Sequence, residues 1–338
     1  MTTLTERLDS YILMRRSLGY DLSTAARVLR GFTRFADREG TNHITVDLFL
    51  RWKKGFGRAD NNTWSARLGM VRGFAGWLQG LDARTEVPPA GLIVGKLRRT
   101  KPYIYPEAQV AKIVTGAAKL SSRYGMRGWT YATLFGLIAV TGLRINEALA
   151  LDDRDIDLEE GVITVRRGKN GTARYVPLAS STIAKLRAYR AERNRLLGPT
   201  NGPFFLLDGG TRPTDCSARY NFALVSQQLG LRQSQPYCKH GRGLRIHDLR
   251  HTFAVRTIIG WYRKGLDADR EMIKLSTYLG HVKPEATYWY IEAVPELLQL
   301  ASKRAERGLA EHGGGQRRDD MNCPRTCSGS SPSDLANR

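Results

Sequence analysis

The segment WTYATLFGLIAVTGLRINEALA, residues 129–150, contains the two elements around which the rest of the chain can be organised. Its first part, Trp129 to Val140, is almost entirely apolar and predicts a buried helix. Thr141 and Gly142 then predict a turn, and Arg144 to Ala150 a second, short helix. Because the arginine stands at the start of that helix, where backbone N–H groups are unpaired, an anion such as a phosphate would be stabilised beside it.

Downstream of this segment the hydrophobic period changes. Val162 to Arg166 and Ala173 to Pro177 are runs with β-branched residues, and they flank Gly168-Lys169-Asn170-Gly171, which is a strong hairpin signal. Helical patterns follow over residues 181–197, 219–229, 247–259, 269–279, 284–290 and 294–307. We therefore predict a fold that is mainly α with a small antiparallel β-sheet.

Upstream, apolar residues recur at helical spacing over residues 4–81, with arginines and lysines between them, which predicts an all-helical domain. About half of these cations would be ordinary solvated residues, but as a group they indicate a surface that faces DNA. The proline-containing and basic stretch before Tyr103 predicts a linker, and Pro106-Glu107 suits the first turn of a new helix. The expected organisation is a helical domain over 1–84, a basic linker over 85–102, an α+β domain over 103–307 and a disordered tail over 308–338.

The charge of the chain points to a polyanionic partner. With 53 Lys and Arg against 32 Asp and Glu, the formal net charge is +21 and the isoelectric point is about 10.1. An anionic membrane surface is the alternative partner, but the longest apolar stretches, such as Tyr131 to Val140, are too short to span a bilayer. Residues 1–10 lack the apolar core of a secretory signal. We expect a nucleic acid as the partner, no membrane, and residence in the cytoplasm.

The cysteines carry little information about function. Cys216, Cys238, Cys323 and Cys327 are too few and too irregular for a disulfide framework, so we expect reduced thiols. A zinc site formed by Cys238, His240 and the Cys323/Cys327 pair is a minor alternative, with odds of about one in ten, because that pair falls in the expected tail. We predict neither a metal nor a cofactor, and the chain has no Gly-rich phosphate loop of the Lys-Ser/Thr type.

Three short motifs carry polar residues that suit phosphate chemistry. Arg144 with Glu147 one turn later would form a charge-assisted pair that orients the guanidinium, although a surface arginine is equally compatible with this segment alone. His247 and Arg250 share one helix face in the run His-Asp-Leu-Arg-His, a pattern that also arises by chance. His281 in Leu-Gly-His precedes Tyr290 by nine residues, and core packing would be the usual explanation for that tyrosine taken alone.

In the order Arg144, Lys169, His247, Arg250, His281 and Tyr290, these residues resemble the catalytic domain of the tyrosine recombinase, or phage integrase, family. The resemblance covers about residues 103–307. Its most specific parts are Thr-Gly-Leu-Arg-x-x-Glu-Ala-Leu, His-x-Leu-Arg-His-Thr, and Leu-Gly-His with a tyrosine nine positions later. The amino-terminal region is similar to the family's core-binding domain by position and composition only.

The resemblance implies a role for each position. Arg144 and Arg250 would hold the scissile phosphate, and His281 would donate a hydrogen bond to it. Tyr290 would be the nucleophile, with His247 as its general base and Lys169 as the acid for the leaving 5′-oxygen. The implied reaction is a metal-independent transesterification through a 3′-phosphotyrosyl link, used for integration, excision or transposition of DNA. Family members act as tetramers on paired sites, of one protein or with a related recombinase, and residues 294–307 suggest a helix that docks onto a neighbour.

Some features depart from the pattern or leave alternatives open. Residues 233–244 look like an insertion before His247, equally compatible with a DNA-contacting loop and with a variable surface loop. Tyr288 is a rival nucleophile two positions short of the family's spacing. A type IB topoisomerase and a non-catalytic DNA-binding regulator are the alternative functions. A metal-dependent nuclease fits less well because a carboxylate cluster is missing.

Overall fold

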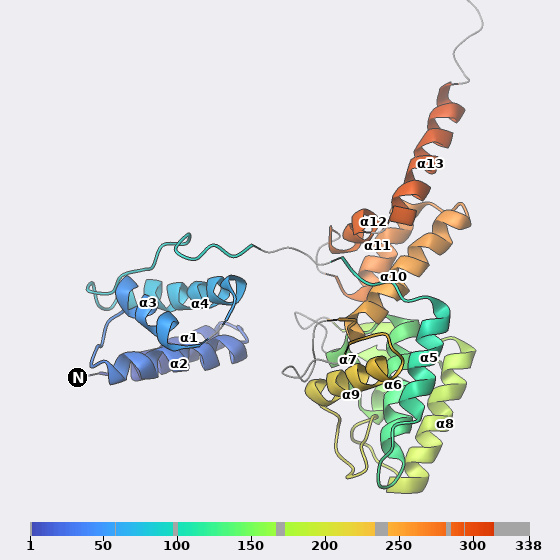
Figure 1. Ribbon diagram of the computed structural model, residues 1–338, viewed down its shortest axis with the longest axis horizontal. Coiled ribbons are helices and arrows are strands. Elements are labelled where there is room, and N and C mark those ends of the chain that lie inside the picture. Colours follow the sequence, from blue (N-terminus) through green and yellow to red (C-terminus); the bar gives the residue numbers. More distant parts are fainter. Residues whose placement is uncertain are drawn as a thin grey trace, which may run out of the picture. The chain divides into compact units, whose positions relative to one another are not determined.

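The chain divides into two compact units, Met1–Thr100 and Lys101–Arg338 (Figure 1). The computed structural model describes residues 2–57, 59–96, 101–166, 173–233, 243–281, 285–293 and 295–313. Four groups of sequence predictions lie outside these ranges: residues 97–100 of the expected basic linker, the hairpin turn with Lys169, most of the 233–244 insertion, and the tail segment with Cys323 and Cys327.

The first unit consists of helices packed around one apolar core. These helices are α1 (Leu4–Ser17), α2 (Ser23–Arg38), α3 (Val46–Gly55) and α4 (Asn61–Gln79). Phe32, Phe49 and Trp64 are almost completely buried, and their rings meet edge to face or tilted. Side chains cap the helix starts: Thr45 Oγ1 and Asp60 Oδ1 each accept a hydrogen bond from a backbone N–H of the first turn. The predicted helical region is confirmed.

The segment that we expected to act as a linker begins as part of this first unit. Thr85 is buried and its hydroxyl contacts the backbone N–H of Ile44, and Ile93 packs into the core of the helices. Prolines and glycines remove the helical period here, which is why the sequence suggested a linker. Apolar burial nevertheless attaches residues 85–93 to the unit.

The second unit is built around α6 (Met126–Thr141), which packs against α5 (Glu107–Ala118), α8 (Ser180–Leu197) and α10 (Ile246–Arg263). The predicted buried helix is confirmed over its centre, where Leu134 and Ile138 are inaccessible, but its ends were predicted wrongly. Trp129 is 43% exposed and Val140 is 53% exposed. A run of apolar residues does not reveal which side of a helix faces solvent, because it has no amphipathic period.

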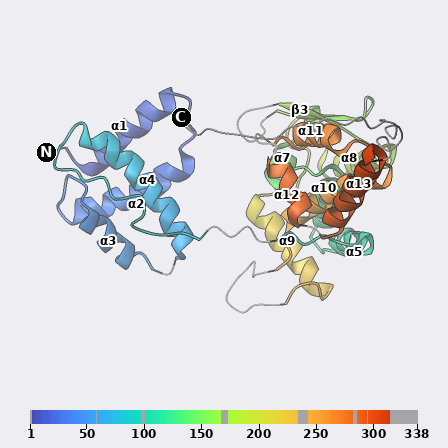
Figure 2. The same ribbon diagram turned by 90° about the horizontal axis from the view of Figure 1, so that it is seen from above.

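A small sheet forms beside α7 (Ile145–Ala150) and the 3-10 turn η1 (Asp153–Asp155). Its strands are β1 (Ile156–Asp157), β2 (Val162–Val165) and β3 (Arg174–Pro177), paired antiparallel in that order. Ile163 pairs with Val176 and Val165 with Arg174, so the predicted hairpin is confirmed. The sequence did not predict β1, which is too short for a strand pattern. Figure 2 shows β3 next to α11 (Ala268–Leu279), and the two elements are in contact.

The last four helices of the described chain lie together at one end of the second unit (Figure 1). They are α10, α11, α12 (Glu285–Ala293) and α13 (Pro295–Gly313). A separate apolar cluster that includes Ile258, Met272, Tyr290 and Leu297 holds these helices together. The expected start of a disordered tail at 308 was wrong, because α13 continues to Gly313. Leu309, Ala310 and Glu311 are good helix formers and explain the extension. In the described part of the chain, no helix is both long and apolar enough to cross a membrane.

Candidate active site

Arg144, the first of the expected site residues along the chain, lies immediately before α7. Its Nη1 donates to Glu147 Oε1 at 2.7 Å, while its backbone N–H donates to Glu147 Oε2 at 3.0 Å. The same guanidinium also donates to the backbone carbonyls of Leu279 and Gly280, at 3.3 and 3.0 Å. The predicted orientation of Arg144 by Glu147 is therefore present, and the guanidinium is tied to the end of α11 as well.

Glu147 has a second cationic partner that the sequence reasoning missed. Arg174, at the start of β3, donates from Nη2 to Glu147 Oε2 at 2.6 Å and from Nη1 to Oε1 at 3.2 Å. Its Nε donates to the carbonyl of Tyr278 at 2.8 Å. Burial raises the pKa of the Glu147 carboxyl, but hydrogen bonds from Arg174 and Arg144 outweigh that effect and leave the pKa lowered. Glu147 is thus an ionised bridge between two arginines.

Arg250 is the deepest cation of the site, with 1% of its surface exposed. Nη1 donates to the carbonyl of Gly142 at 2.7 Å, and Nη2 donates to the carbonyl of Leu279 at 2.8 Å. Burial, followed by the nearby charge of Arg144, lowers the pKa of the guanidinium to about 10, which still leaves it protonated at neutral pH. Because Leu279 O accepts from both Arg144 and Arg250, the two guanidinium groups lie next to each other.

His281 joins this pair from the turn after α11. Gly280 ends that helix in the left-handed conformation, with φ of 65°, and so directs His281 back toward the arginines. Its Nε2 lies 3.0 Å from Arg250 Nη2, and its Nδ1 lies 2.7 Å from the hydroxyl of Thr287, a buried residue of α12. Burial, with Arg250 and Arg144 nearby, lowers the pKa of His281 to about 3. The imidazole is therefore neutral at physiological pH.

Tyr290 lies beside this group on α12. Its ring stacks near that of His281, with centroids 6.4 Å apart, and only 2% of the residue is exposed. Its hydroxyl oxygen lies 3.0 Å from Nδ1 of His251. Tyr288, the rival nucleophile, is 38% exposed. Of the two tyrosines, Tyr290 is the one that is packed with the site's histidines.

His247 lies one turn before His251 on α10, and the two rings meet at a centroid distance of 4.5 Å. Burial is the main reason that the pKa of each imidazole is lowered to about 4, so both are neutral at pH 7. The structure thus brings together five of the six residues expected from the sequence: Arg144, His247, Arg250, His281 and Tyr290. The sixth, Lys169, lies outside the described residues.

His251 and Arg174 are the residues that sequence reasoning did not assign. His251 belongs to the motif that includes Arg250, and its spacing of four from His247 already placed it on the same helix face. Arg174 shares a strand face with the buried Val176, because alternate residues of a strand point the same way. An arginine on that inward face would be largely buried and would need a carboxylate partner, which is the signal that could have found it.

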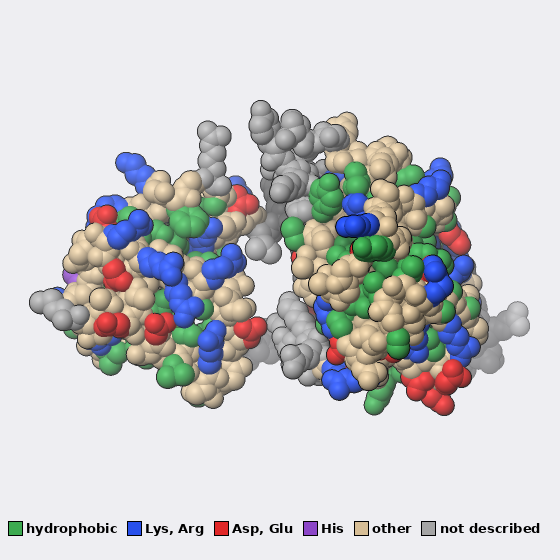
Figure 3. All heavy atoms as spheres, turned by 90° about the horizontal axis from the view of Figure 1, so that it is seen from below, with side chains coloured by type: hydrophobic (Ala, Val, Ile, Leu, Met, Phe, Trp, Pro, Cys, Tyr) green, Lys and Arg blue, Asp and Glu red, His purple; other side chains and the backbone are tan. Residues whose placement is uncertain are grey.

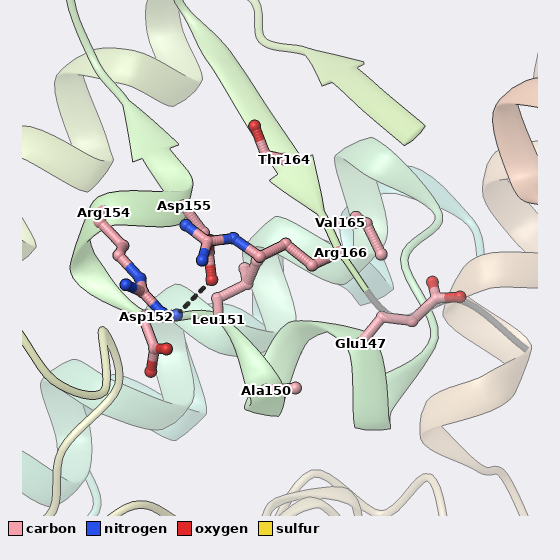
Figure 4. A pocket seen from close by; sticks show the side chains of 9 residues that line it. All are labelled: Glu147, Ala150, Leu151, Asp152, Arg154, Asp155, Thr164, Val165 and Arg166. Carbon is pink, nitrogen blue, oxygen red and sulfur yellow. Dashed lines mark hydrogen bonds and ion pairs between the residues drawn. The ribbon is translucent and has the colours of Figure 1, made fainter. Parts of the chain in front are cut away.

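The arrangement differs from a small-molecule pocket. A hollow of about 320 Å³ is bordered by α7, η1 and β2, but Glu147 is its only lining residue that also belongs to the site (Figure 4). Figure 4 shows the Glu147 carboxylate turned away from Asp152, Arg154 and Asp155 at the other end. No group of three or more side chains suited to a metal ion occurs among the residues that the structure describes.

Basic side chains are dispersed over the visible surface of both units (Figure 3). On the face shown in Figure 3, Lys and Arg side chains lie among apolar and acidic ones. In the first unit Arg16, Arg27, Arg34 and Lys54 are exposed. Others are paired locally, as in the contacts of Arg51 with Glu39 and Asp47. Neighbouring carboxylates therefore neutralise only part of the positive charge on this surface.

Comparisons with known proteins agree on one family. Residues 106–296, more than half of the chain, match the sequence model of the Phage integrase family. The candidate integrase/recombinase y4rB of Sinorhizobium fredii (strain NBRC 101917 / NGR234) is 38% identical over 91% of this chain and 98% of its own length. The tyrosine recombinase XerC of Chromobacterium violaceum is 27% identical over 66% of this chain and 67% of its own.

Among solved structures, the Tn1549 transposon integrase in complex with transposon right end DNA has a similar fold. Its TM-score is 0.61, at 16% identity, over 90% of this chain and 99% of that one. At this identity the match concerns the fold alone. It agrees with the mainly helical architecture and the small antiparallel sheet described above.

Proposed function

Since the chain belongs to the phage integrase family of tyrosine recombinases, enzymes that cleave and rejoin DNA at specific sites, we propose that it does so through a covalent 3′-phosphotyrosyl bond to Tyr290. The observation that carries the proposal is the convergence of Arg144, Arg250 and His281 beside Tyr290. Leu279 O joins the two guanidinium groups, and His281 lies 3.0 Å from one of them.

The two arginines and His281 would bind one scissile phosphate. Guanidinium groups donate in a planar fork that matches two phosphate oxygens, and they neutralise the charge that builds in a pentacoordinate transition state. The burial of Arg250 strengthens that interaction, because little solvent screens it. Glu147 and Arg174 would hold Arg144 in place rather than touch the DNA.

Tyr290 Oη would attack the phosphorus and displace a 5′-hydroxyl, with Lys169 as the acid that protonates the leaving oxygen. The resemblance gave His247 the role of general base. Since the hydroxyl of Tyr290 contacts His251 instead, we propose that His247 donates a hydrogen bond to the phosphate. A 5′-hydroxyl from a partner strand would reverse the step. Energy of the phosphodiester is kept in the covalent bond, so ATP is not needed, and the guanidinium charges take the place of a divalent ion.

The partners follow from this chemistry. We propose that the substrate is double-stranded DNA, bound partly by the basic surface of the first unit acting as a clamp (residues 1–84), and that the enzyme works in the cytoplasm with the nucleoid. The DNA complexes of related structures, such as the Tn1549 integrase, support this proposal. Tetramers on two paired sites, with α13 docked onto a neighbouring protomer, remain part of the proposal.

The test is covalent capture on nicked DNA. Full-length protein is incubated, with EDTA, with a pool of nicked duplexes of random sequence, and adducts are separated on a denaturing gel and sequenced. We expect adducts from wild type and from Tyr288→Phe but none from Tyr290→Phe. Adducts that persist in Tyr290→Phe would exclude this nucleophile. DNA binding without any adduct from wild type would favour a non-catalytic regulator, and relaxation of a single supercoiled plasmid without a partner site would favour a topoisomerase.

A further inference from the structure

The contact between His251 and Tyr290 has no role in the reaction described so far. The Tyr290 hydroxyl oxygen lies 3.0 Å from His251 Nδ1, and the ring centroids are 5.4 Å apart. The two residues come from different helices, α10 and α12, so the contact depends on how these helices pack. With only 2% of Tyr290 exposed, bulk water has little access to take up the phenolic proton.

The surroundings of His251 determine its protonation state. His247 and Arg250 lie near it on α10, Arg245 lies at the N-cap of that helix, His281 follows the end of α11, and Trp289 and Tyr290 belong to α12. Burial, Arg245, Arg250 and His281 together lower the pKa of the imidazole to about 4. A neutral imidazole has one nitrogen without a proton, and it is therefore able to accept one.

We propose that His251 is a further catalytic residue, which takes the proton from the Tyr290 hydroxyl as Oη attacks the phosphorus. This inference rests on the proposed function. The O–H bond of Tyr290 breaks and an N–H bond forms at Nδ1, while the Oη–P bond forms and the bond from phosphorus to the 5′-oxygen breaks, that oxygen taking its proton from Lys169 as proposed above; rejoining returns this proton to Lys169. On rejoining, the imidazolium returns the proton to Oη as the tyrosine leaves. Protons and electron pairs balance in both directions without any further reactant.

A bound phosphate makes this proton transfer easier. In the free protein, Arg245 and Arg250 disfavour a positive charge on His251. A phosphodiester anion held by Arg144 and Arg250 offsets part of that cationic field and raises the proton affinity of the imidazole. General bases work best when their pKa approaches the working pH, so His251 becomes an effective acceptor only after DNA is bound.

The experiment compares full-length wild type with His251→Asn and with His247→Asn, which loses the proposed hydrogen bond to the phosphate and is therefore expected to be slower than wild type but to keep its pH profile. An asparagine amide oxygen takes the approximate place of Nδ1, so His251→Asn keeps a hydrogen-bond acceptor for Tyr290 but removes its basicity. The rate of covalent adduct formation is measured in single turnover from pH 5.5 to 9.5, on a nicked duplex captured by wild type. Circular dichroism and DNA affinity confirm that each variant is folded.

We expect His251→Asn to slow adduct formation about 100-fold at pH 7, within the range usual for loss of a general base. Its rate should then rise with pH up to 9.5, because hydroxide must remove the phenolic proton before attack. Wild type and His247→Asn should instead reach a plateau near neutral pH. A duplex with sulfur in place of the bridging 5′-oxygen should restore the rate of Lys169→Ala but not that of His251→Asn, since sulfur needs no acid to leave.

A rate and pH profile of His251→Asn equal to those of wild type would overturn the inference. The hydrogen bond to Tyr290 would then be enough for full activity, and no basic side chain would be needed at residue 251. Rescue of His251→Asn by the sulfur-bridged duplex would also overturn it, because the residue would then act on the leaving group. These failures differ from failure of the proposed function. In that case wild type itself forms no adduct at Tyr290, and the role of His251 falls with it.

Discussion

Replacing Glu147 by glutamine should destabilise the second unit far more than the loss of an exposed charge would. Within the described residues, the carboxylate accepts four hydrogen bonds, two from Arg144 and two from Arg174, at 2.6 to 3.2 Å. Its side chain is 4% exposed and that of Arg174 is 10% exposed. An amide replaces one acceptor oxygen with a donor that faces guanidinium donors, and it leaves Arg174 without its counter-charge.

Breaking a buried ion pair by removing one partner costs about 3–5 kcal/mol, and we expect about 3 kcal/mol for Glu147→Gln because half of the acceptor sites remain. For a unit of this size, that corresponds to a fall of about 6–12 °C in the melting temperature. Thermal and urea unfolding of the full chain measure both quantities. The matched control is Glu159→Gln, which removes an exposed pair with Arg187, whose side chains are 87% and 52% accessible. The control should lose less than about 1 kcal/mol. Equal losses in the two variants would refute the argument that Glu147 bridges two cations inside the site.

Three further predictions concern the same site. The lowered pKa of Glu147 means that its ionised form stabilises the folded state above its ordinary pKa of 4.5, and that this contribution is lost as the pH falls through the folded value. The difference in unfolding free energy between wild type and Glu147→Gln should therefore shrink from pH 6 to pH 3, and a constant difference in urea titrations would contradict the assignment. Thr287→Val removes the hydroxyl that holds His281 Nδ1 at 2.7 Å, and should slow adduct formation about 10-fold with little change in DNA affinity, a loss of about 1.4 kcal/mol in the transition state. Gly142→Ala should destabilise the fold by about 1–3 kcal/mol, because φ is 64° and an added Cβ would lie 2.5 Å from Phe253 Cδ1; unchanged urea unfolding would show that the turn relaxes freely.

Much of the fold could be predicted because local signals agree with the tertiary structure. The β-branched runs around residues 168–171 gave the pairing of β2 with β3, and Pro106-Glu107 marked the start of α5. The link between Arg144 and Glu147 could be predicted as well, since both residues lie within one helical turn. Interactions that depend on a fixed spacing in one element are readable from the sequence.

The remaining features depend on contacts between distant elements. Arg174 reaches Glu147 only because β3 lies beside the end of α11, where it also contacts Tyr278 O. His251 reaches Tyr290 because α12 packs against α10. Helical spacing gives the face on which a side chain lies but not which side chain of a second helix it meets. The family resemblance implied His247 as the base, and helical spacing could not reveal that His251 is the histidine in contact with Tyr290, the proposed nucleophile.

The way in which the site holds its arginines also explains how it remains able to bind an anion. Arg250 is fixed by the carbonyls of Gly142 and Leu279, and Arg144 by those of Leu279 and Gly280 in addition to Glu147. Carbonyl oxygens satisfy guanidinium donors without cancelling their charge, whereas a carboxylate on each arginine would leave nothing for a phosphate to neutralise. Among the described ion pairs, Glu147 supplies one negative charge to Arg144 and Arg174 together, and the histidines around Tyr290 are neutral at pH 7. The protein therefore keeps a buried excess of positive charge in a fixed geometry, and under the proposed function a phosphate of the DNA would supply the missing anion.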